Sequence, residues 1–333
     1  MTQKNKRPTL QDVADRVGIT KMTVSRYLKD PALVSVAIQS KIANALDELG
    51  YIPNRAPDLL SNAKSKAIGV LVPSLTNQVF AEVIRGIESV TEQTGYQTML
   101  AHYGYSAEVE QDRIASLLSY HVDGLILSES YHTARTLRMI QTAGVPVVEI
   151  MDSCSPAVEQ AVGFDNSAAC YAMTRLMIQK GYRRIVYFGA RMDVRTRLKM
   201  EGYAQAMRES NLPEAYQTTD KASSFSIGAE LFNAARQQYP EMDGIVCTND
   251  DLAIGALFEC QRKGISVPDT VGISGFHGHD ISQMLVPKLA TVVTPREKIG
   301  VIAASELLAR IHGNHDFDPL IDLGFELSAG QSI

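Results

Sequence analysis

The stretch TLQDVADRVGITKMTVSR, residues 9–26, predicts two short helices separated by a tight turn. Thr9 can cap the first helix, because an acidic residue three positions later completes the spacing of a capping box. Gly18 then breaks that helix. Thr20 can cap a second helix over residues 21–28, on which polar and apolar side chains occupy opposite faces. The pattern is that of a helix-turn-helix.

A third helix is expected between Ser35 and Gly50, because apolar residues recur there at helical spacing. A helix-turn-helix places its second helix in the major groove of DNA, with the first residues toward the base edges. Arginine and lysine donate to guanine, methionine packs on a thymine methyl, and hydroxyls anchor phosphates. The candidate DNA contacts in this segment are Thr9, Thr20, Lys21, Met22, Thr23, Ser25 and Arg26.

Charge divides the chain just beyond these helices. Residues 1–66 carry 11 Lys and Arg against 6 Asp and Glu, a balance of +5. Residues 67–333 carry 21 against 31, a balance of −10. A small basic segment joined to an acidic one suggests that the basic segment meets a polyanion, with chance clustering of charge as the alternative.

The spacing of short motifs in the first 54 residues resembles the lactose-repressor family of bacterial regulators. The resemblance is dense and keeps the family spacing throughout this segment. The motifs lie at residues 9–14, 18–20, 23–26, 34–35 and 49–54.

The resemblance implies a hinge helix over residues 54–61, which folds on DNA. Leu60 stands at the family's hinge leucine, which wedges into the minor groove at the operator centre. Asn54 and Arg55 are implied DNA contacts as well. Pro57 departs from the pattern because it lacks a backbone N–H and fits only in the first turn of a helix. The hinge helix is therefore expected to begin late or to depend unusually on DNA.

From residue 66 onward the sequence alternates between strands and helices. The strands are continuous apolar runs, which indicate parallel sheets covered by helices on both faces. Two series of strands predict two doubly wound α/β lobes. Ligands of such sheets bind beyond the carboxyl ends of the strands, where helix N-termini favour anions. The expected strands are 67–72, 96–101, 124–127 and 145–150 in the first series, and 185–188, 245–247 and 271–275 in the second.

The family resemblance continues through this part, at residues 79–82, 162–166, 202–203, 248–250, 275–276 and 287–291. It implies a DNA-binding domain over 1–62 and a core of the periplasmic-binding-protein type over 63–333, with a sugar-sensing cleft between lobes. Three crossings between the lobes are implied near 163–165, 292–295 and 323–327. The first lobe then holds about 66–163 and 294–324, and the second about 164–293 and 325–333.

Two departures from the family pattern fall in the implied cleft. Lys199 stands where many members have an arginine, and Arg195 and Arg197 come just before it. His277 stands where members tend to have an aspartate that binds sugar hydroxyls. An imidazole in place of a carboxylate removes repulsion against an anionic ligand. The alternatives are a loop histidine bonded only to backbone and a lysine on a solvated helix face.

This combination of groups suits a polyhydroxy acid. Residues 20–26, 248–253 and 275–280 resemble the gluconate-responsive members of the family, so D-gluconate is the expected effector. The alternative is another sugar ligand, chiefly a related aldonic or keto-aldonic acid such as idonate. The other implied effector contacts are Ser74, Asn77, Phe80, Ser128, Asp165, Asn249 and Asp250.

The resemblance implies a repressor that binds palindromic double-stranded operator DNA as a homodimer and is released by its effector. The leucine heptads that some members carry at the C-terminus are absent, which suggests a dimer and no tail-built tetramer. No cofactor, metal or catalytic residue is expected. The spacing of His277, His279 and Asp280 leaves a metal-dependent hydrolase as a distant alternative. A nucleophile elbow, a phosphate loop and a dinucleotide fingerprint are absent, which argues against an enzyme.

The start of the chain is polar and basic with no apolar stretch behind it, which argues against a signal peptide and an exported binding protein. No stretch approaches 18 apolar residues, so no partnership with a membrane is expected. The four cysteines, Cys154, Cys170, Cys247 and Cys260, show no close pairing and indicate reduced thiols. A cytoplasmic protein is expected.

Overall fold

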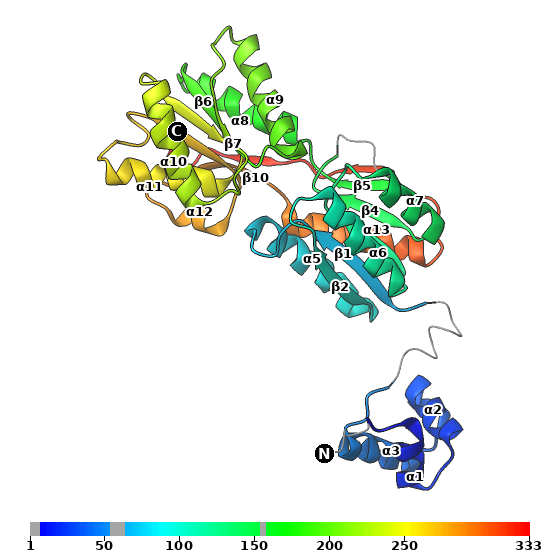
Figure 1. The fold of residues 1–333 in the computed structure, drawn as a ribbon. Helices are drawn as coiled ribbons and strands as arrows, with labels where there is room; N and C mark the ends of the chain where they lie inside the picture. The colour runs from blue at the N-terminus through cyan, green and yellow to red at the C-terminus, as the bar shows by residue number, and fades with distance from the viewer. Residues whose placement is uncertain (1–6, 54–63, 154–157) are drawn as a thin grey trace, which may run out of the picture. The chain divides into compact units, whose positions relative to one another are not determined.

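The computed structural model describes residues 7–53, 64–153 and 158–333. The chain divides into two compact units, Met1–Ser65 and Lys66–Ile333, here called the N-terminal and C-terminal units (Figure 1). Within the described residues, no helix is long and apolar enough to cross a membrane.

The N-terminal unit is a small helical bundle. Both halves of the expected capping box form, since Thr9 N donates to Asp12 Oδ2 at 2.7 Å and Asp12 N donates to Thr9 Oγ1 at 3.4 Å. Gly18 ends the first helix with a φ of 75°, a left-handed conformation that glycine adopts without strain. The elements are α1 (Leu10–Val17), α2 (Lys21–Lys29), the 3-10 helix η1 (Pro31–Leu33) and α3 (Val36–Leu49). Their core consists of Val13, Ala14, Val24, Ile42 and Ala45.

Lobe 1 of the C-terminal unit is built on a parallel sheet in the order β11-β5-β4-β3-β1-β2. Its strands are β1 (Ala67–Val72), β2 (Gln97–His102), β3 (Gly124–Leu127), β4 (Val147–Ile150), β5 (Gln160–Gly163) and β11 (Leu320–Asp322). Its helices are α5 (Gln78–Thr94), α6 (Ala107–Ser119), α7 (Ala134–Ala143) and α13 (Arg296–Ile311).

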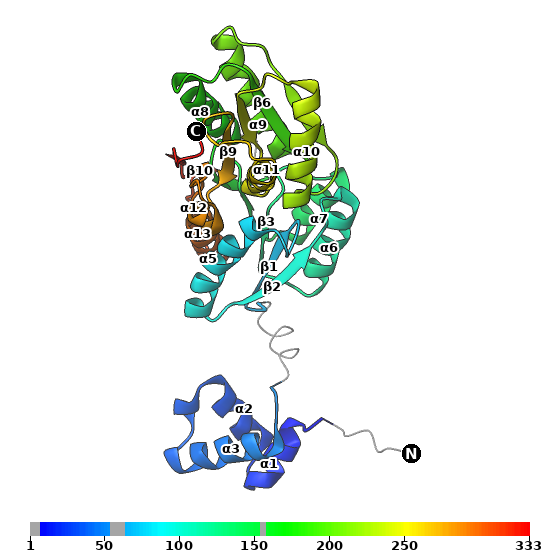
Figure 2. The same ribbon diagram turned by 90° about the vertical axis from the view of Figure 1, so that its left-hand side faces the viewer.

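Lobe 2 repeats this plan on a sheet in the order β12-β10-β9-β8-β6-β7, in which only the β10–β12 pair is antiparallel. Its strands are β6 (Ile185–Ala190), β7 (Tyr216–Thr219), β8 (Gly244–Cys247), β9 (Gly272–His277), β10 (Ala290–Val293) and β12 (Glu326–Ser328). Its helices are α8 (Asn166–Gln179), α9 (Val194–Glu209), α10 (Phe225–Gln238), α11 (Asp250–Arg262) and α12 (Asp280–Met284). Figures 1 and 2 show helices on both faces of each sheet.

The predicted α/β class with two doubly wound lobes is confirmed. The strands expected from continuous apolar runs are present: 67–72 and 124–127 have the expected bounds, and the bounds of the others differ by one or two residues. Five shorter strands, β5, β7, β10, β11 and β12, lacked a continuous apolar signal. The edge strands β7, β11 and β12 are partly exposed, and the buried strands β5 and β10 each include a polar residue, Gln160 and Thr291.

Glycines allow neighbouring helices that pack against each sheet to approach each other closely. In lobe 1, α5 crosses α13 at Gly86 and Gly300, where an added Cβ would come within 2.2 Å of Glu297 O and 2.1 Å of Val83 O respectively. The backbones are therefore in direct contact, and a larger residue at either position would separate the helices. This contact joins a helix near residue 80 to one near residue 300.

The chain passes from one sheet to the other three times. It leaves β5 in lobe 1 to form α8 in lobe 2, leaves β10 in lobe 2 to form α13 in lobe 1, and passes from β11 to β12 through residues 323–325. Neither lobe is therefore a continuous stretch of sequence. Buried residues of both lobes meet at the crossings, where the rings of Phe164 and Phe276 lie 6.1 Å apart.

Candidate functional site

The exposed face of α2 carries the side chains expected to contact DNA. Lys21, Met22, Ser25 and Arg26 are exposed, whereas Val24 between them is buried in the core. Met22 is 64% exposed, which is high for a large apolar side chain and suits contact with a partner. The second helix of the helix-turn-helix therefore presents polar and basic groups outward while its other face holds the unit together.

The threonines of this surface also serve the helices themselves. Thr20 Oγ1 accepts from Thr23 N at 3.3 Å and lies 3.0 Å from Thr23 Oγ1, so its hydroxyl starts α2. Thr9 is exposed and caps α1 in the same way. Three other expected DNA contacts, Asn54, Arg55 and Leu60, and the hinge over 54–61 lie outside the described residues.

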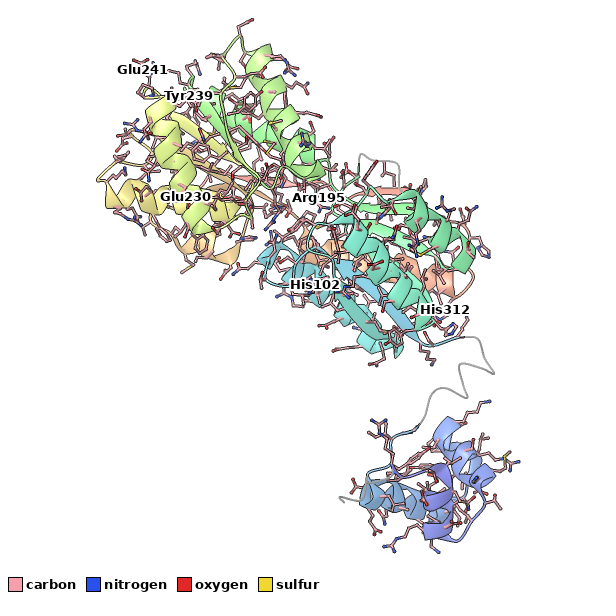
Figure 3. The ribbon with its side chains drawn as sticks, viewed as in Figure 1. His102, Arg195, Glu230, Tyr239, Glu241 and His312 are labelled. Atoms are coloured by element: carbon pink, nitrogen blue, oxygen red, sulfur yellow. The ribbon has the colours of Figure 1, made fainter. Side chains whose placement is uncertain are left out.

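A cavity opens between the two lobes of the C-terminal unit and encloses about 470 Å³ of empty space, part of it open to solvent. Figure 3 shows Arg195, one of the residues that line it, where the lobes meet. The lining residues are Asn77, Val79, Phe80, Tyr105 and Met151 of lobe 1 and Ala190, Arg191, Asp193, Arg195, Thr196, Lys199, Ser223, Thr248, Asn249 and His277 of lobe 2.

Two arginines of lobe 2 reach across to lobe 1. Arg195 is buried, and its Nη1 donates to Ser128 O while its Nη2 lies 4.0 Å from Glu129 Oε2. Arg191 lies with its guanidinium 4.0 Å from the centre of the Tyr105 ring, in a cation–π contact. Both contacts form at the cavity, so they link the lobes beside any ligand that binds there.

Lys199 and His277 form a buried pair on the lobe 2 wall. Lys199 Nζ lies 3.2 Å from His277 Nε2 and donates to Thr248 O at 3.1 Å. It also lies 3.8 Å from the centre of the Phe276 ring. The other ring nitrogen of His277, Nδ1, lies 3.3 Å from Thr294 Oγ1. Neither side chain is on a solvated surface, and both ring nitrogens of His277 contact side chains.

Burial determines the ionisation of this pair. Burial lowers the pKa of His277 well below 6.5, and the charges of Lys199 and Arg296 lower it further, so the imidazole is neutral. Burial also lowers the pKa of Lys199 to about 7, an effect that Asp193 opposes and Arg195 increases. The wall therefore carries a neutral ring beside an amine that titrates near neutrality.

The remaining charges leave the cavity with an excess of positive charge. Burial lowers the pKa of Arg195, but Glu129 and its other neighbours outweigh burial and raise it, so the guanidinium stays charged. Burial raises the pKa of Asp193, but Arg195 and the Thr196 hydrogen bonds outweigh it and the carboxyl stays ionised. With Arg191 added, the lining residues favour an anionic ligand.

Unusual backbone conformations are concentrated at the cavity. Eight non-glycine residues within the described ranges have a positive φ, and four of them line the cavity. They are Tyr105 at 63°, Met151 at 79°, Arg191 at 69° and His277 at 102°. Such conformations cost on the order of 1 kcal/mol or more each and persist where surrounding contacts enforce them, as at ligand-binding sites.

Six of the eleven expected effector contacts line the cavity: Asn77, Phe80, Arg195, Lys199, Asn249 and His277. Of the rest, Ser74 bonds to Thr76, and the Ser128 hydroxyl lies 3.4 Å from Tyr103 Oη. Asp165 caps α8, and Arg197 is exposed with its Nε bonded to Met192 O. The structure therefore places these four side chains in contacts within the protein.

Asp250 is the most informative of the expected contacts that lie elsewhere. Its carboxylate is fully buried and accepts from Thr291 Oγ1 at 2.7 Å and from His279 N at 2.6 Å. An added Cβ on Gly275 would come within 2.2 Å of Asp250 Oδ1, so the absence of a side chain there makes room for it. Asp250 holds the loop after β9 in place and thereby positions His277.

Several lining residues were not among the contacts expected from the sequence, including Arg191, Tyr105 and Thr248. Arg191 directly follows β6, and Thr248 directly follows β8. Both thus lie at the carboxyl ends of parallel strands, the edge where such sheets bind ligands. The position directly after the expected strand 245–247 marks Thr248. The expected strand 185–188 ends three residues before Arg191, and Tyr105 lies three residues beyond β2 in a loop with no such signal.

The spacing of His277 and His279 does not produce a group of metal ligands. The two rings are stacked with centres 6.2 Å apart, and the described part of the chain contains no group of three or more His, Cys, Asp or Glu able to hold a metal ion. The grouping required by the metal-dependent hydrolase alternative is not found there.

Two family descriptions match the chain. Residues 9–54 match bacterial regulatory proteins of the lacI family. Residues 65–322 match the periplasmic binding proteins and sugar binding domain of the LacI family. The HTH-type transcriptional regulator GntR of Escherichia coli strain K12 is 62% identical over 330 residues, which cover 99% of this chain and 100% of that protein.

Solved structures show the same architecture. A LacI-family transcriptional regulator from Silicibacter pomeroyi matches with a TM-score of 0.92 and 32% identity, covering 98% of this chain and 99% of that chain. The lac repressor dimer bound to operator and the anti-inducer ONPF matches with a TM-score of 0.86 over 98% of this chain and 99% of that one. At 22% identity, the second likeness concerns the fold.

Proposed function

Because the chain belongs to the LacI family of bacterial regulatory proteins and is a DNA-binding transcriptional repressor, not an enzyme, we propose that its effector is a sugar acid, D-gluconate first among them. The effector binds between the lobes of the C-terminal unit and lowers the affinity for operator DNA. Asn77, Asn249 and Ser223 are neutral hydrogen-bonding groups suited to hydroxyls, and the cations of lobe 2 are suited to a carboxylate.

The observation that supports this proposal most strongly is the pair Lys199–His277. An aspartate in the place of His277 would put a negative charge beside the ligand, whereas the buried histidine is neutral. Arg195 and Lys199 then face the cavity with only Asp193 to offset them among its lining side chains. An uncharged sugar gains little from such a wall, but a carboxylate gains a charge-assisted hydrogen bond.

We propose that the N-terminal unit uses α2 in the major groove and that two copies bind a near-palindromic site. Lys21, Met22, Ser25 and Arg26 are the base-facing candidates, with Thr9, Thr20 and Thr23 beside the phosphates. Asn54, Arg55 and Leu60 are retained as candidates from the sequence alone.

An exposed apolar patch on lobe 2 supports the dimer. The rings of Phe225 and Phe258 meet edge to face at 6.5 Å, and both are exposed. Gln261 on the same helix as Phe258 donates to Val286 O, which brings the exposed Val286 beside it. We propose a second copy as the occupant of this patch, in line with the dimeric lac repressor of the same fold.

Release of DNA requires that gluconate and operator favour different states of the dimer. Arg191 and Arg195 belong to lobe 2 and contact lobe 1, so a ligand that binds beside them changes how the two lobes close on each other. Reciprocity then requires operator DNA to weaken gluconate binding by the same factor that gluconate weakens operator binding.

The test uses the purified full chain. A duplex is first selected from random sequence by repeated binding, and its affinity is measured with and without D-gluconate, idonate and glucose. We expect a two-fold symmetric site, steep weakening with salt, and release by gluconate. Arg26→Ala should relax specificity, whereas Lys29→Ala, exposed at the far end of α2, should not. Release by idonate alone would reassign the effector, and the absence of any selected site would contradict the proposal.

A further inference from the structure

Among the described residues, Lys199 has no carboxylate at ion-pair distance, whereas the other buried cation of the cavity, Arg195, lies 4.0 Å from Glu129 Oε2. The Nζ of Lys199 contacts Thr248 O, His277 Nε2 and the Phe276 ring, and the residue is only 4% exposed. Within the described residues, no carboxylate oxygen forms an ion pair with it. A buried ammonium without an opposite charge is costly, which makes this side chain sensitive to any anion that enters the cavity.

The two arginines are already occupied. Arg195 donates to Ser128 O and lies near Glu129, and Arg191 covers Tyr105. A ligand carboxylate would have to share these guanidinium groups with lobe 1. Of the two buried cations among the described residues of the wall, Lys199 is therefore the one without a carboxylate partner.

The contacts of Lys199 suit both of its protonation states. A neutral amine donates to Thr248 O and accepts from a His277 Nε2–H, with Nδ1 then accepting from the Thr294 hydroxyl. An ammonium donates to Thr248 O and to His277 Nε2, with Nδ1–H then donating to the same hydroxyl. Because hydroxyl and imidazole can each reverse roles, the lysine can change its charge without moving the wall.

Several charged groups face Lys199 from the elements packed around it. Burial lowers the pKa of Lys199 to about 7, Asp193 raises it, and Arg195 lowers it. The pKa of the neutral neighbour His277 is well below 6.5, and burial raises that of Asp250 to about 6. The surrounding titratable or charged groups are Asp193 at the N-cap of α9, Arg195 on α9, Cys170 on α8, Asp250 on α11, His277 on β9, His279 in the loop after it, and Arg296 on α13. Lys199 thus titrates above the carboxyl and imidazole groups around it.

We infer that Lys199 selects a carboxylate over an uncharged sugar and takes up one proton from solution as that carboxylate binds. The inference rests on the proposed function, since it assigns the acid group of the effector to one residue. The proton adds to the amine to give an ammonium, which pairs with the ligand carboxylate, so charge balances inside the cavity. Arginine, which is always charged, could not respond in this way.

The linkage has a definite sign. Below pH 7 the lysine is already protonated, so affinity for the acid changes little with pH. Above pH 7 each binding event must protonate the amine, so affinity falls as pH rises, by about fivefold between pH 7 and pH 8 for a pKa of about 7. His277 and Asp250 titrate lower and do not contribute at pH 8.

The experiment is calorimetry of the full chain with D-gluconate at pH 8 in two buffers of different ionisation enthalpy, HEPES and Tris. We expect uptake of about 0.9 proton for each gluconate bound. D-glucitol, which has the hydroxyl chain without the carboxylate, should bind more weakly and without uptake. Lys199→Arg should bind gluconate with no uptake, and Lys199→Met should lose the preference for gluconate over glucitol. Lys221→Met, at an exposed lysine paired with Glu230, is the matched control and should behave as the wild type.

The outcomes separate this inference from the function on which it rests. Gluconate binding without buffer dependence in the wild type, or equal proton uptake in Lys199→Arg, would overturn the role of Lys199 and leave the effector assignment intact. No gluconate binding by the folded wild type at any pH would overturn the effector assignment itself. The arginine variant keeps a cation in place, so it decides the question even if Lys199→Met fails to fold.

Discussion

The two lobes contribute to the cavity in different ways. Among the described lining residues, lobe 1 contributes the neutral side chains Asn77, Val79, Phe80, Tyr105 and Met151. Lobe 2 contributes the charged ones, Arg191, Asp193, Arg195 and Lys199. The difference indicates that lobe 2 selects the charge of the ligand, whereas lobe 1 supplies the surface that closes against it.

Lobe 1 has its own ionisable cluster, but it is used for structure. His132 Nδ1 lies 3.1 Å from Glu110 Oε2, and its Nε2 lies 2.9 Å from Glu149 Oε1. All three side chains are buried, and none of them lines the cavity. The cluster anchors the loop that also presents Ser128 and Glu129 to Arg195.

Arg195 provides the strongest test of the comparison, because it carries charge from lobe 2 and also holds lobe 1. Arg195→Ala should weaken gluconate binding by about 100-fold or more, since it breaks the buried contact with Ser128 and Glu129 that holds the lobes together beside the ligand. Breaking a buried charged contact of this kind costs about 2–5 kcal/mol. Calorimetry measures this, with thermal melting to confirm folding. Arg197→Ala, two residues along α9 and exposed, is the control and should bind normally. Equal losses in both variants would show that the effect comes from the charge of the helix as a whole.

His277→Asp tests charge selection alone. The new carboxylate would face the ligand's carboxylate and compete for Lys199, so the preference for gluconate over glucitol should fall by about 30-fold, or about 2 kcal/mol. His277→Asn keeps the site neutral and should retain most of the preference. Calorimetry with both ligands gives the ratio directly. A ratio unchanged by aspartate would mean that His277 does not face the acid group.

His132 tests whether the charges of lobe 1 serve stability. Burial lowers its pKa, but the hydrogen bonds and charges of Glu110 and Glu149 outweigh burial and raise it to about 9. Because the pKa of His132 is higher in the folded state than the unfolded value of 6.5, its protonation stabilises the folded state. This stabilisation is fully present below pH 6.5 and is lost as the pH rises through 9.

The melting temperature of the wild type should therefore fall between pH 6.5 and pH 9.5. In His132→Gln it should start several degrees lower and fall less over the same range. Thermal melting followed by circular dichroism measures both, with the exposed His315→Gln as the control. Parallel pH profiles for His132→Gln and the wild type would remove the cluster from this role.

The smallest effect is expected at Tyr105, the lobe 1 partner of Arg191. Tyr105→Leu removes the ring under the guanidinium and should weaken gluconate binding by about threefold, as a cation–π contact of about 0.5–1 kcal/mol predicts. Tyr105→Phe keeps the ring and loses only the hydroxyl that accepts from Asn77 Nδ2 at 3.2 Å, so it should bind better than the leucine variant. If the two variants bind gluconate equally, the Arg191 contact does not contribute.

The fold could be predicted because its signals are local. The capping box at Thr9, the turn at Gly18 and the buried run Ala67–Val72 each act within one element. The site could be predicted where a family motif lies at the end of a strand, as at His277 and Asn249. Residues at the carboxyl ends of parallel strands lie at the ligand-binding edge of a sheet, and the apolar runs in the sequence predict where those strands end.

The rest of the site depends on contacts between distant parts of the chain. Asp250 is a residue type that often contacts ligands, but its carboxylate accepts hydrogen bonds from Thr291 and His279. The absence of a side chain on Gly275 leaves room for that carboxylate. Arg191 and Tyr105 come from loops with left-handed backbones in different lobes. No local pattern encodes such a pairing, because it exists only when the lobes meet.

The crossings between lobes have a consequence for the synthesis of the protein. Lobe 1 receives α13 and the strand Leu320–Asp322 late, and lobe 2 receives its strand Glu326–Ser328 only a few residues later. On the ribosome, β5 and β10 therefore keep an unpaired side until residues 320–328 have emerged, a state that favours aggregation. A stop codon shortly before residue 320 would leave both lobes unfinished at once, so even this late truncation would remove the effector response rather than trim it.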